Sequence, residues 1–396
     1  MCIVERIGIY GGSFNPPHTG HLRAARQAVE TLGLSRLLMI PTGVAPHKEL
    51  PADSPTPQQR LEMLRIAVGS DPNLTVSDLE IRQETVSYTC DTVQALRQSH
   101  PSAQLILLMG TDMFLSFESW KNPEQILQNA ALGVFYRGQP GEEAAVQAQK
   151  EKLEAMGAKV YVLENPVTDI SSTQLRRMLV FRCADELLPE GVADYIRAHH
   201  LYGTGRNYQN LPEQELEQVV CCLLKPSRVA HVLGCRQAAV ELAKRWGANE
   251  TDAARAALLH DITKALDGQL QLALCRSYGK ALDDFSLHYP KTLHALTGSL
   301  VAQRIFGENE AVVSAICSHT TGKANMNLLE TILYVADYME PNRDFPGVEE
   351  LRYLTTVDMN KALQRGLEMT LEHLSQQGEA VSDASREALE YLRAKK

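Results

Sequence analysis

Short aliphatic runs alternate with amphipathic, helix-length segments over residues 1 to about 200. This order is typical of βαβ units, in which parallel strands form a sheet covered by helices. The expected strands span residues 6–10, 36–40, 74–79, 104–109, 132–136 and 159–163. We therefore expect a doubly wound α/β domain with a parallel sheet in this half of the chain.

Two helices in this half have readable ends. Thr56 can cap a helix that has Pro57 at its first position, and Gln59 completes a capping box. The helix predicted at 20–32 stops at Gly33, which can adopt the positive φ of a C-terminal cap.

The pattern changes at residues 201–205, a polar passage with two glycines. Strand-like runs disappear after it, and amphipathic helices are expected at 226–246, 251–266, 291–306, 309–319 and 328–339. The sequence thus predicts a first domain at 1–203, a linker at 204–214 and an all-α domain at 215–396.

Composition narrows the class of protein. The chain has 396 residues, 44% of them hydrophobic, which is typical of globular domains. Its 39 basic and 48 acidic residues give a net charge of −9, so a nucleic-acid partner is not expected. No apolar run is long enough for a membrane helix, and residues 1–10 do not resemble a signal peptide. We expect a cytoplasmic protein without membrane association, and homo-oligomer formation is left open.

The first predicted strand runs into Gly11-Gly12-Ser13-Phe14-Asn15-Pro16-Pro17-His18-Thr19-Gly20-His21. A loop after the first strand lies at the carboxyl edge of the sheet, where ligands bind. Glycines allow backbone N–H groups to approach phosphate, and the next helix directs its positive end there. The imidazoles of His18 and His21 could stabilise the charge that develops when pyrophosphate leaves.

A second segment, Ile170-Ser171-Ser172-Thr173-Gln174-Leu175-Arg176, has hydroxyls at a predicted helix start and an arginine one turn later. It could bind phosphate or be an ordinary capping sequence.

Together the two segments resemble the HxGH and ISSTxxR motifs of the nucleotidyltransferase superfamily. Four further segments are similar to nicotinate-nucleotide adenylyltransferases: 41–48 with Ala45-Pro46-His47-Lys48, 87–92 with Ser87-Tyr88-Thr89, 109–112 with Met109-Gly110-Thr111-Asp112, and 119–121 with Ser119-Trp120-Lys121. The resemblance covers nearly all of residues 1–203 and implies a Rossmann-like fold. It also implies the transfer of AMP from ATP to nicotinate mononucleotide, with Mg²⁺ accompanying ATP.

The resemblance also implies roles for individual residues. His18 and His21 would bind the ATP phosphates, and Ser172, Thr173 and Arg176 would hold the β and γ phosphates. The remaining implied ligand contacts are Gly11, Gly12, Ser13, Phe14 and Lys48 in the nucleotide site, Gly110 and Asp112 at adenosine, Trp120 stacked on the pyridine ring, and Tyr88 with Thr89 near its carboxylate.

One departure concerns pyridine recognition, because Thr85-Val86 stand where that family usually has Gly and often Pro. Pantetheine-phosphate and cytidylyl transferases share the HxGH loop, but Thr89, Trp120 and the 45–48 segment argue against them.

The helical half contains a set of histidines and aspartates on five predicted helices or their ends: His231, His260, Asp261, His294, His319 and Asp337. His260-Asp261 and Asp337 stand among aliphatic residues, where an uncompensated charge is costly. A bound metal would compensate it, and imidazole with carboxylate but no thiolate favours Fe, Mn or Co.

This ordered set resembles the HD-domain phosphohydrolases, and the segments 318–323 and 333–347 are similar to bacterial symmetrical diadenosine tetraphosphatases. The resemblance covers about residues 215–395. It implies two divalent metals, one held by His231, His260, Asp261 and Asp337 and the other by His294 and His319, with Asp261 bridging. The implied reaction converts diadenosine tetraphosphate, a dinucleoside polyphosphate, to two ADP. Lys264 and Arg343 are candidate phosphate contacts, although Lys264 could equally be a solvated helix charge.

Two alternatives stay open for this half. It could hydrolyse another nucleotide phosphoester, because ligands define the reaction type and the pocket walls define the substrate. It could also be a nucleotide-binding module that regulates the first domain without catalysis.

Overall fold

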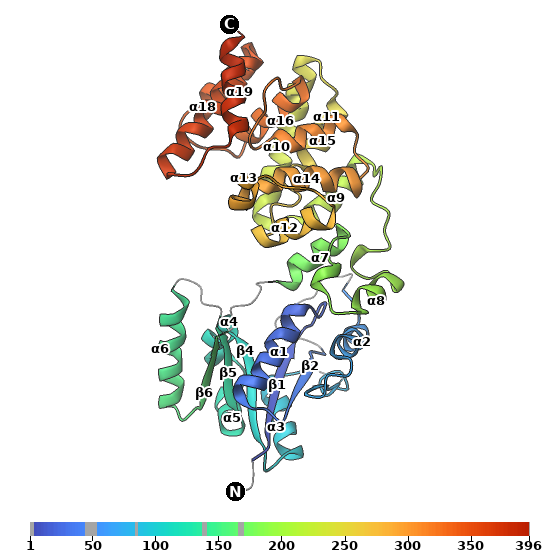
Figure 1. Cartoon of the computed structure of the whole chain (residues 1–396), viewed down its shortest axis with the longest axis vertical. Coiled ribbons are helices and arrows are strands. Elements are labelled where there is room, and N and C mark those ends of the chain that lie inside the picture. The colour runs from blue at the N-terminus through green and yellow to red at the C-terminus, as the bar shows by residue number, and fades with distance from the viewer. Residues whose placement is uncertain (1–3, 44–53, 84–85, 137–140, 165–169, 396) are drawn as a thin grey trace. The chain divides into compact units, whose positions relative to one another are not determined.

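The computed structural model describes residues 4–43, 54–83, 86–136, 141–164 and 170–395 (Figure 1). The chain divides into two compact units, Met1–Arg206 and Asn207–Lys396. Each unit is described separately below.

The first unit is built on a six-stranded, fully parallel sheet with the strand order β3-β2-β1-β4-β5-β6 (Figure 1). The strands are β1 (Arg6–Gly12), β2 (Arg36–Pro41), β3 (Leu74–Val76), β4 (Gln104–Gly110), β5 (Ala131–Tyr136) and β6 (Val160–Glu164). Because β1 lies between β2 and β4, the strand order reverses at the β1–β4 pair. The doubly wound α/β prediction is therefore confirmed, and the switch point places a ligand crevice beyond β1 and β4.

One strand is shorter than predicted. Of the expected 74–79 segment, only Leu74–Val76 is a strand; a turn follows, in which the backbone N–H of Arg82 donates to the Asp78 carbonyl at 3.0 Å.

The helices of this unit are α1 (Thr19–Leu32), α2 (Pro57–Val68), α3 (Thr89–Ser99), α4 (Thr111–Leu115), α5 (Pro123–Asn129), α6 (Glu142–Ala155), α7 (Ser172–Val180) and α8 (Val192–Ala198). Both predicted helix ends are confirmed. Thr56 and Gln59 form the capping box of α2, and Gly33 ends α1 with a φ of 58°.

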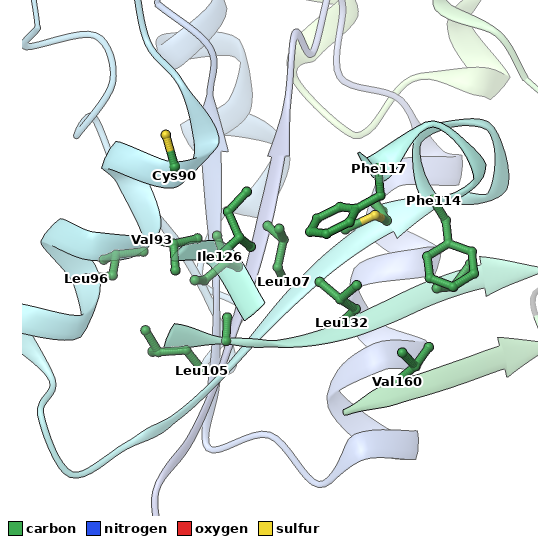
Figure 2. Close-up of a cluster of buried hydrophobic side chains, with 14 of the residues drawn as sticks. Cys90, Val93, Leu96, Leu105, Leu107, Phe114, Phe117, Ile126, Leu132 and Val160 are labelled. Atoms are coloured by element: carbon green, nitrogen blue, oxygen red, sulfur yellow. The ribbon is translucent and has the colours of Figure 1, made fainter. Parts of the chain in front are cut away.

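The core of this unit forms where alternate strand residues meet helices. Ile7 and Ile9 of β1 and Leu105 and Leu107 of β4 are buried in one cluster, to which α3 and α5 contribute Val93 and Ile126 (Figure 2). Side chains alternate between the two faces of a strand, so these residues anchor one face while the carboxyl ends of the strands stay available for ligand.

The second unit is helical, with no strand among residues 207–395. Its helices are α9 (Glu213–Leu223), α10 (Pro226–Trp246), α11 (Glu250–Leu259), α12 (Gly268–Ser277), α13 (Asp284–His288), α14 (Leu293–Arg304), α15 (Glu310–Ser318), α16 (Leu328–Met339), α17 (Val348–Val357), α18 (Met359–Gln377) and α19 (Asp383–Ala394). In the described part of the chain, no helix is both long and apolar enough to cross a membrane.

The helix predicted at 251–266 was wrong at its C-terminal end. α11 stops at Leu259, and successive turns follow in which Lys264 N–H bonds to the Asp261 carbonyl at 2.9 Å. The side-chain hydroxyl of Thr263 donates to the carbonyl of His294 at 3.1 Å. His260 and Asp261 therefore project from a turn at the helix end.

Candidate active sites

The loop between β1 and α1 forms the first candidate site. A Cβ added at Gly11, or at Gly110 on the neighbouring β4, would meet no heavy atom within 4 Å. Both glycines thus leave backbone open at the β1–β4 switch point, as a closely approaching phosphate or nucleoside requires. Phe14 is buried below the loop with its ring 5.0 Å from that of His21.

His18 and His21 lie against each other at the start of α1. Their ring centroids are 3.6 Å apart, and the His18 backbone N–H donates to His21 Nδ1 at 3.2 Å. Burial lowers the pKa of His18 to about 4, and burial with the nearby His18 lowers the pKa of His21 well below its usual value. Both rings are therefore neutral hydrogen-bonding groups at neutral pH.

Arg176 connects the loop after β1 with the segment at the start of α7. It donates to the Asn15 carbonyl at 2.9 Å and to Thr173 Oγ1 at 3.1 Å. Ser171 caps α7 by accepting from the Gln174 N–H, so Ser172 and Thr173 occupy its first turn. The positive end of α7 and the β1–α1 loop consequently belong to one site.

Arg60 is a buried residue of this site that the sequence analysis missed. It lies on α2, is 1% exposed, and donates to the carbonyls of Ser13 at 2.8 Å and Thr42 at 2.6 Å. It therefore joins the loops that follow β1 and β2. Its sequence position in an ordinary amphipathic helix gives no signal of this role.

The residues expected near adenosine and pyridine lie at neighbouring strand and helix ends. Gly110 ends β4 and Asp112 lies in the first turn of α4. Tyr88 precedes α3, of which Thr89 is the first residue, and Trp120 is half-buried with its ring 5.3 Å from that of Phe117. The predicted contact Lys48 and the departure at Thr85 lie outside the described residues, whereas Val86 is exposed.

The second candidate site lies wholly in the helical unit, where all six predicted residues meet. One Asp261 oxygen lies 3.8 Å from His231 Nε2 and 3.5 Å from His260 Nε2. Its other oxygen lies 3.5 Å from His294 Nε2 and 3.9 Å from His319 Nε2. Asp261 thus stands between two pairs of imidazoles.

Asp337 completes one end of this cluster, with its carboxylate 3.0 Å from His231 Nε2 and 3.9 Å from His260 Nε2. Ligand atoms of His231, His260 and Asp337, and likewise those of His260, Asp261 and His319, lie within 4.8 Å of one another. Such spacing suits coordination of a shared ion.

Each imidazole of the cluster is oriented through its Nδ1 atom. Those of His260, His294 and His319 face backbone carbonyls at 2.7, 2.9 and 2.7 Å. The Nδ1 of His231 faces Glu340 Oε1 at 3.1 Å. This arrangement directs the Nε2 atoms at the cluster, as in metal sites where a second hydrogen bond fixes the ligating histidine.

The residues present fit a metal. The Nε2 atom of His260 and one oxygen of Asp261 are buried and have no hydrogen-bond partner within the described residues. Burial lowers the pKa of His260 and His319 to about 3. Burial alone would raise the pKa of Asp337, but the hydrogen bond from His231 and the nearby histidines hold it well below its usual value. Neutral imidazoles and ionised carboxylates are the states that bind metal.

Three cationic side chains surround the cluster. Lys264 Nζ lies 3.0 Å from His294 Nε2, and Arg343 donates to Asp337 Oδ1 at 3.0 Å. Arg228, one turn before His231, donates to Asp261 and was missed by the sequence analysis. The cations accompany a cavity of about 1220 Å³, which His294, His319 and Asp337 line at the cluster.

Glu340 was also missed, although it orients His231. The Asn342 backbone and side-chain N–H groups donate to its Oε2 at 2.7 and 2.9 Å, leaving Oε1 for His231. Gly234 makes room for it, since a Cβ there would lie 2.3 Å from Glu340 Oε2.

Replacing Glu340 with glutamine should lower the affinity for divalent metal by about 10- to 100-fold, because an amide supports the His231 ligand less well than a carboxylate. The measurement is an equilibrium titration of the full chain with Mn²⁺, followed by electron paramagnetic resonance. Glu387→Gln, at an exposed glutamate of the same unit, is the matched control. An affinity within twofold of the parent protein would contradict the role of Glu340.

The metal-free helical unit should lose stability as the pH falls below about 6.5. His260, His294 and His319 stay neutral when folded because burial depresses each pKa, whereas the unfolded chain protonates them near 6.5. The unfolded state then binds more protons, so the free energy of unfolding falls by up to roughly 4 kcal/mol per pH unit for three groups. The loss levels off near pH 3, where His260 and His319 titrate in the folded state.

Urea unfolding at pH 7, 6 and 5 measures this loss. The chain has two tryptophans, so a Trp120→Phe variant leaves Trp246 to report on the helical unit. Removal of the exposed His288 and His373 should leave the pH dependence unchanged. A free energy of unfolding that stays constant from pH 7 to 5 would refute the buried neutral state.

Comparisons with known proteins agree with the two-part organisation. A family model described as Cytidylyltransferase-like matches residues 9–178, and a model of the HD domain matches residues 228–342. A Mycoplasma pneumoniae protein named "Probable nicotinate-nucleotide adenylyltransferase/Ap4A hydrolase" is 30% identical over 339 residues, which cover 85% of this chain and 88% of that protein.

Other relatives match one half each. A Neisseria meningitidis protein named "Probable nicotinate-nucleotide adenylyltransferase" is 35% identical over 204 residues, covering 50% of this chain and 99% of that protein. A crystal structure described as a "predicted HD superfamily hydrolase involved in NAD metabolism from Clostridium acetobutylicum" is 35% identical and covers 47% of this chain and 99% of its own, with a TM-score of 0.46.

Proposed function

The chain belongs to the family of two-domain proteins named nicotinate-nucleotide adenylyltransferase/Ap4A hydrolase, and on this premise we propose that it is a bifunctional enzyme. Residues 1–203 transfer AMP from ATP to nicotinate mononucleotide, giving deamido-NAD and pyrophosphate. Residues 215–396 hydrolyse diadenosine tetraphosphate (Ap4A) to two ADP. Both reactions use nucleotides of the cytoplasm, where we place the protein.

The observation that best supports the transfer reaction is the bond from Arg176 to the Asn15 carbonyl, because it unites two phosphate-binding segments that are 161 residues apart. In the proposed reaction a phosphate oxygen of the mononucleotide attacks the α-phosphorus of ATP, and the bond to pyrophosphate breaks. His18 and His21 donate hydrogen bonds to the phosphates, while Arg176 and the first turn of α7 hold the leaving pyrophosphate. Mg²⁺ supplies charge neutralisation as the counterion of ATP.

The proposed contacts to adenosine and to the pyridine ring come from residues at the ends of neighbouring strands and helices. Open backbone at Gly11 and Gly110 admits the nucleotide, and Asp112 contacts its adenosine. Trp120 stacks on the pyridine ring, whose carboxylate meets the backbone at Tyr88 and Thr89. These assignments rest on the match to the family motif.

The observation that best supports the hydrolytic reaction is that each carboxylate oxygen of Asp261 faces a different pair of histidines. We assign His231, His260, Asp261 and Asp337 to one divalent ion and His294 and His319 to a second, with Asp261 shared. Iron, manganese and cobalt suit this donor set. When bound, the ions supply an activated water and stabilise charge on phosphate. Lys264 and Arg343 bind phosphate oxygens beside the cluster and orient the chain of phosphates.

Pyrophosphate release from ATP by the full chain tests the transfer reaction. We expect release with nicotinate mononucleotide as the acceptor and none above background with phosphopantetheine. The opposite preference would overturn the assignment.

For the hydrolytic half, Ap4A and a panel of mononucleotides, each with Mn²⁺, Fe²⁺ or Co²⁺, separate the proposed reaction from the two alternatives. Faster hydrolysis of a mononucleotide than of Ap4A would indicate a different phosphoester, and no hydrolysis at all would favour a regulatory module.

A further inference from the structure

The cavity of the helical unit is larger than a mononucleotide needs. Its volume of about 1220 Å³ exceeds the roughly 300–1,000 Å³ of typical small-molecule pockets. It starts at the metal-binding cluster and runs between the α13 region on one side and α16 with α18 on the other. It can therefore hold a ligand larger than a mononucleotide.

Two aromatic pairs line this cavity in different places. Phe285 and Tyr289 lie at α13 with ring centroids 5.0 Å apart. Tyr338 and Phe345 lie at and beyond the end of α16, with centroids 6.3 Å apart. Aromatic rings in a cavity that also carries cationic side chains are the usual platforms for stacking nucleobases.

Along the chain, each pair adjoins a different residue of the histidine–aspartate cluster. Tyr338 follows Asp337 directly, and Asp337 lies 3.0 Å from His231 on one side of Asp261. Tyr289 instead lies one short turn before His294, which faces the other Asp261 oxygen at 3.5 Å. Each aromatic pair is therefore attached beside a different residue of the cluster, and these two residues belong to different sides of Asp261.

The two platforms differ in rigidity. The Tyr338 hydroxyl bonds to Thr370 Oγ1 at 2.5 Å, and its ring stacks on Tyr334 with an interplanar angle of 11°. The Tyr289 side chain is 44% exposed. One base would meet a preformed surface, and the other would bind at the mouth of the cavity.

The geometry points to two nucleobase subsites, one on Tyr338 with Phe345 and one on Tyr289 with Phe285, that bind the two ends of a dinucleoside polyphosphate across the cluster. This inference rests on the proposed hydrolytic function and deepens it, because it assigns specificity for a two-base substrate to named residues. With one base on each side of the cluster, the middle of the polyphosphate would lie at the cluster, where central cleavage gives two ADP.

The test compares Ap4A, which has two bases, with adenosine 5′-tetraphosphate, which has one. For Ap4A, Tyr338→Leu and Tyr289→Leu should each lower kcat/KM by about 5- to 150-fold, the range expected when one stacked base loses its aromatic partner. For adenosine 5′-tetraphosphate, at most one of the two variants should lower kcat/KM, because a single base occupies a single aromatic pair. Tyr338→Phe, which keeps the ring and loses the bond to Thr370, should stay within about threefold of the parent.

Tyr353→Leu is the matched control, since Tyr353 is 66% exposed and does not line the cavity. Equilibrium binding of Ap4A to the same full-length variants without metal gives a second readout that does not depend on hydrolysis. Binding and kcat/KM that stay within twofold in both leucine variants would overturn the two subsites. A parent protein that binds Ap4A through both tyrosines but releases no ADP would instead overturn the proposed function.

Discussion

Replacing Asp261 with alanine should lower the hydrolysis of Ap4A by roughly 10³-fold. Its two oxygens are the groups that face both imidazole pairs, so the variant loses the link between the proposed metal positions. Metal ions contribute several kcal/mol to stabilising charge in phosphate transfer, and each 1.4 kcal/mol corresponds to a factor of ten in rate. Steady-state hydrolysis by the full chain, at saturating Mn²⁺, measures this loss.

The prediction for Asp261→Ala has two controls: the other activity of the same protein and a second variant in the helical unit. Adenylyl transfer by the same preparation should stay within twofold, because Asp261 belongs to the other compact unit. Glu387→Ala removes an exposed carboxylate from the helical unit and should preserve both activities. Hydrolysis within tenfold of the parent rate in Asp261→Ala would be incompatible with a bridging role.

Replacing His21 with alanine should lower kcat for adenylyl transfer by about 10²- to 10³-fold, the usual effect of losing one donor that stabilises developing charge. The ring also contacts Phe14 and His18, so it is held in place before substrate binds. Single-turnover formation of deamido-NAD separates this effect on chemistry from an effect on binding.

A matched variant for this prediction is His199→Ala, which removes an exposed histidine of the same unit. It should leave both activities unchanged, and His21→Ala should leave Ap4A hydrolysis unchanged. A His21→Ala variant that changes only KM would show that the ring binds ATP without stabilising the transition state.

Local sequence patterns were sufficient to predict several of the elements that carry the two sites. Strand β1 and the capping residues Thr56, Gln59 and Gly33 act through neighbours within a few positions, so their roles are visible in the sequence. The four histidines and two aspartates that meet in the helical unit could be listed from the sequence, because His260-Asp261 and Asp337 stand among aliphatic residues and the ordered set resembles the HD-domain pattern.

Long-range contacts explain what the sequence analysis did not foresee. Arg60, Arg228 and Glu340 act through partners 18 to 109 residues away, and each lies in a segment that reads as an ordinary helix or turn. The early end of α11 at Leu259 is accompanied by a contact of the same kind, from the Thr263 hydroxyl to the His294 carbonyl 31 residues later. Tertiary contacts of this kind override local helix propensity.

The acidic composition is compatible with two polyphosphate sites. Anion binding is assigned to glycine backbone, helix ends, a few cations and metal ions, so neither site depends on a basic surface. The net charge of −9 therefore argues against nucleic acid without arguing against nucleotides.

Analysis of the products formed from Ap4A by the full-length, Mn²⁺-loaded protein tests the central claim most directly. The cluster around Asp261, with a base held at each end of the substrate, predicts ADP as the single nucleotide product, at two per Ap4A consumed. Formation of ATP together with AMP would contradict the account, because it would place the cleaved bond away from the centre of the substrate.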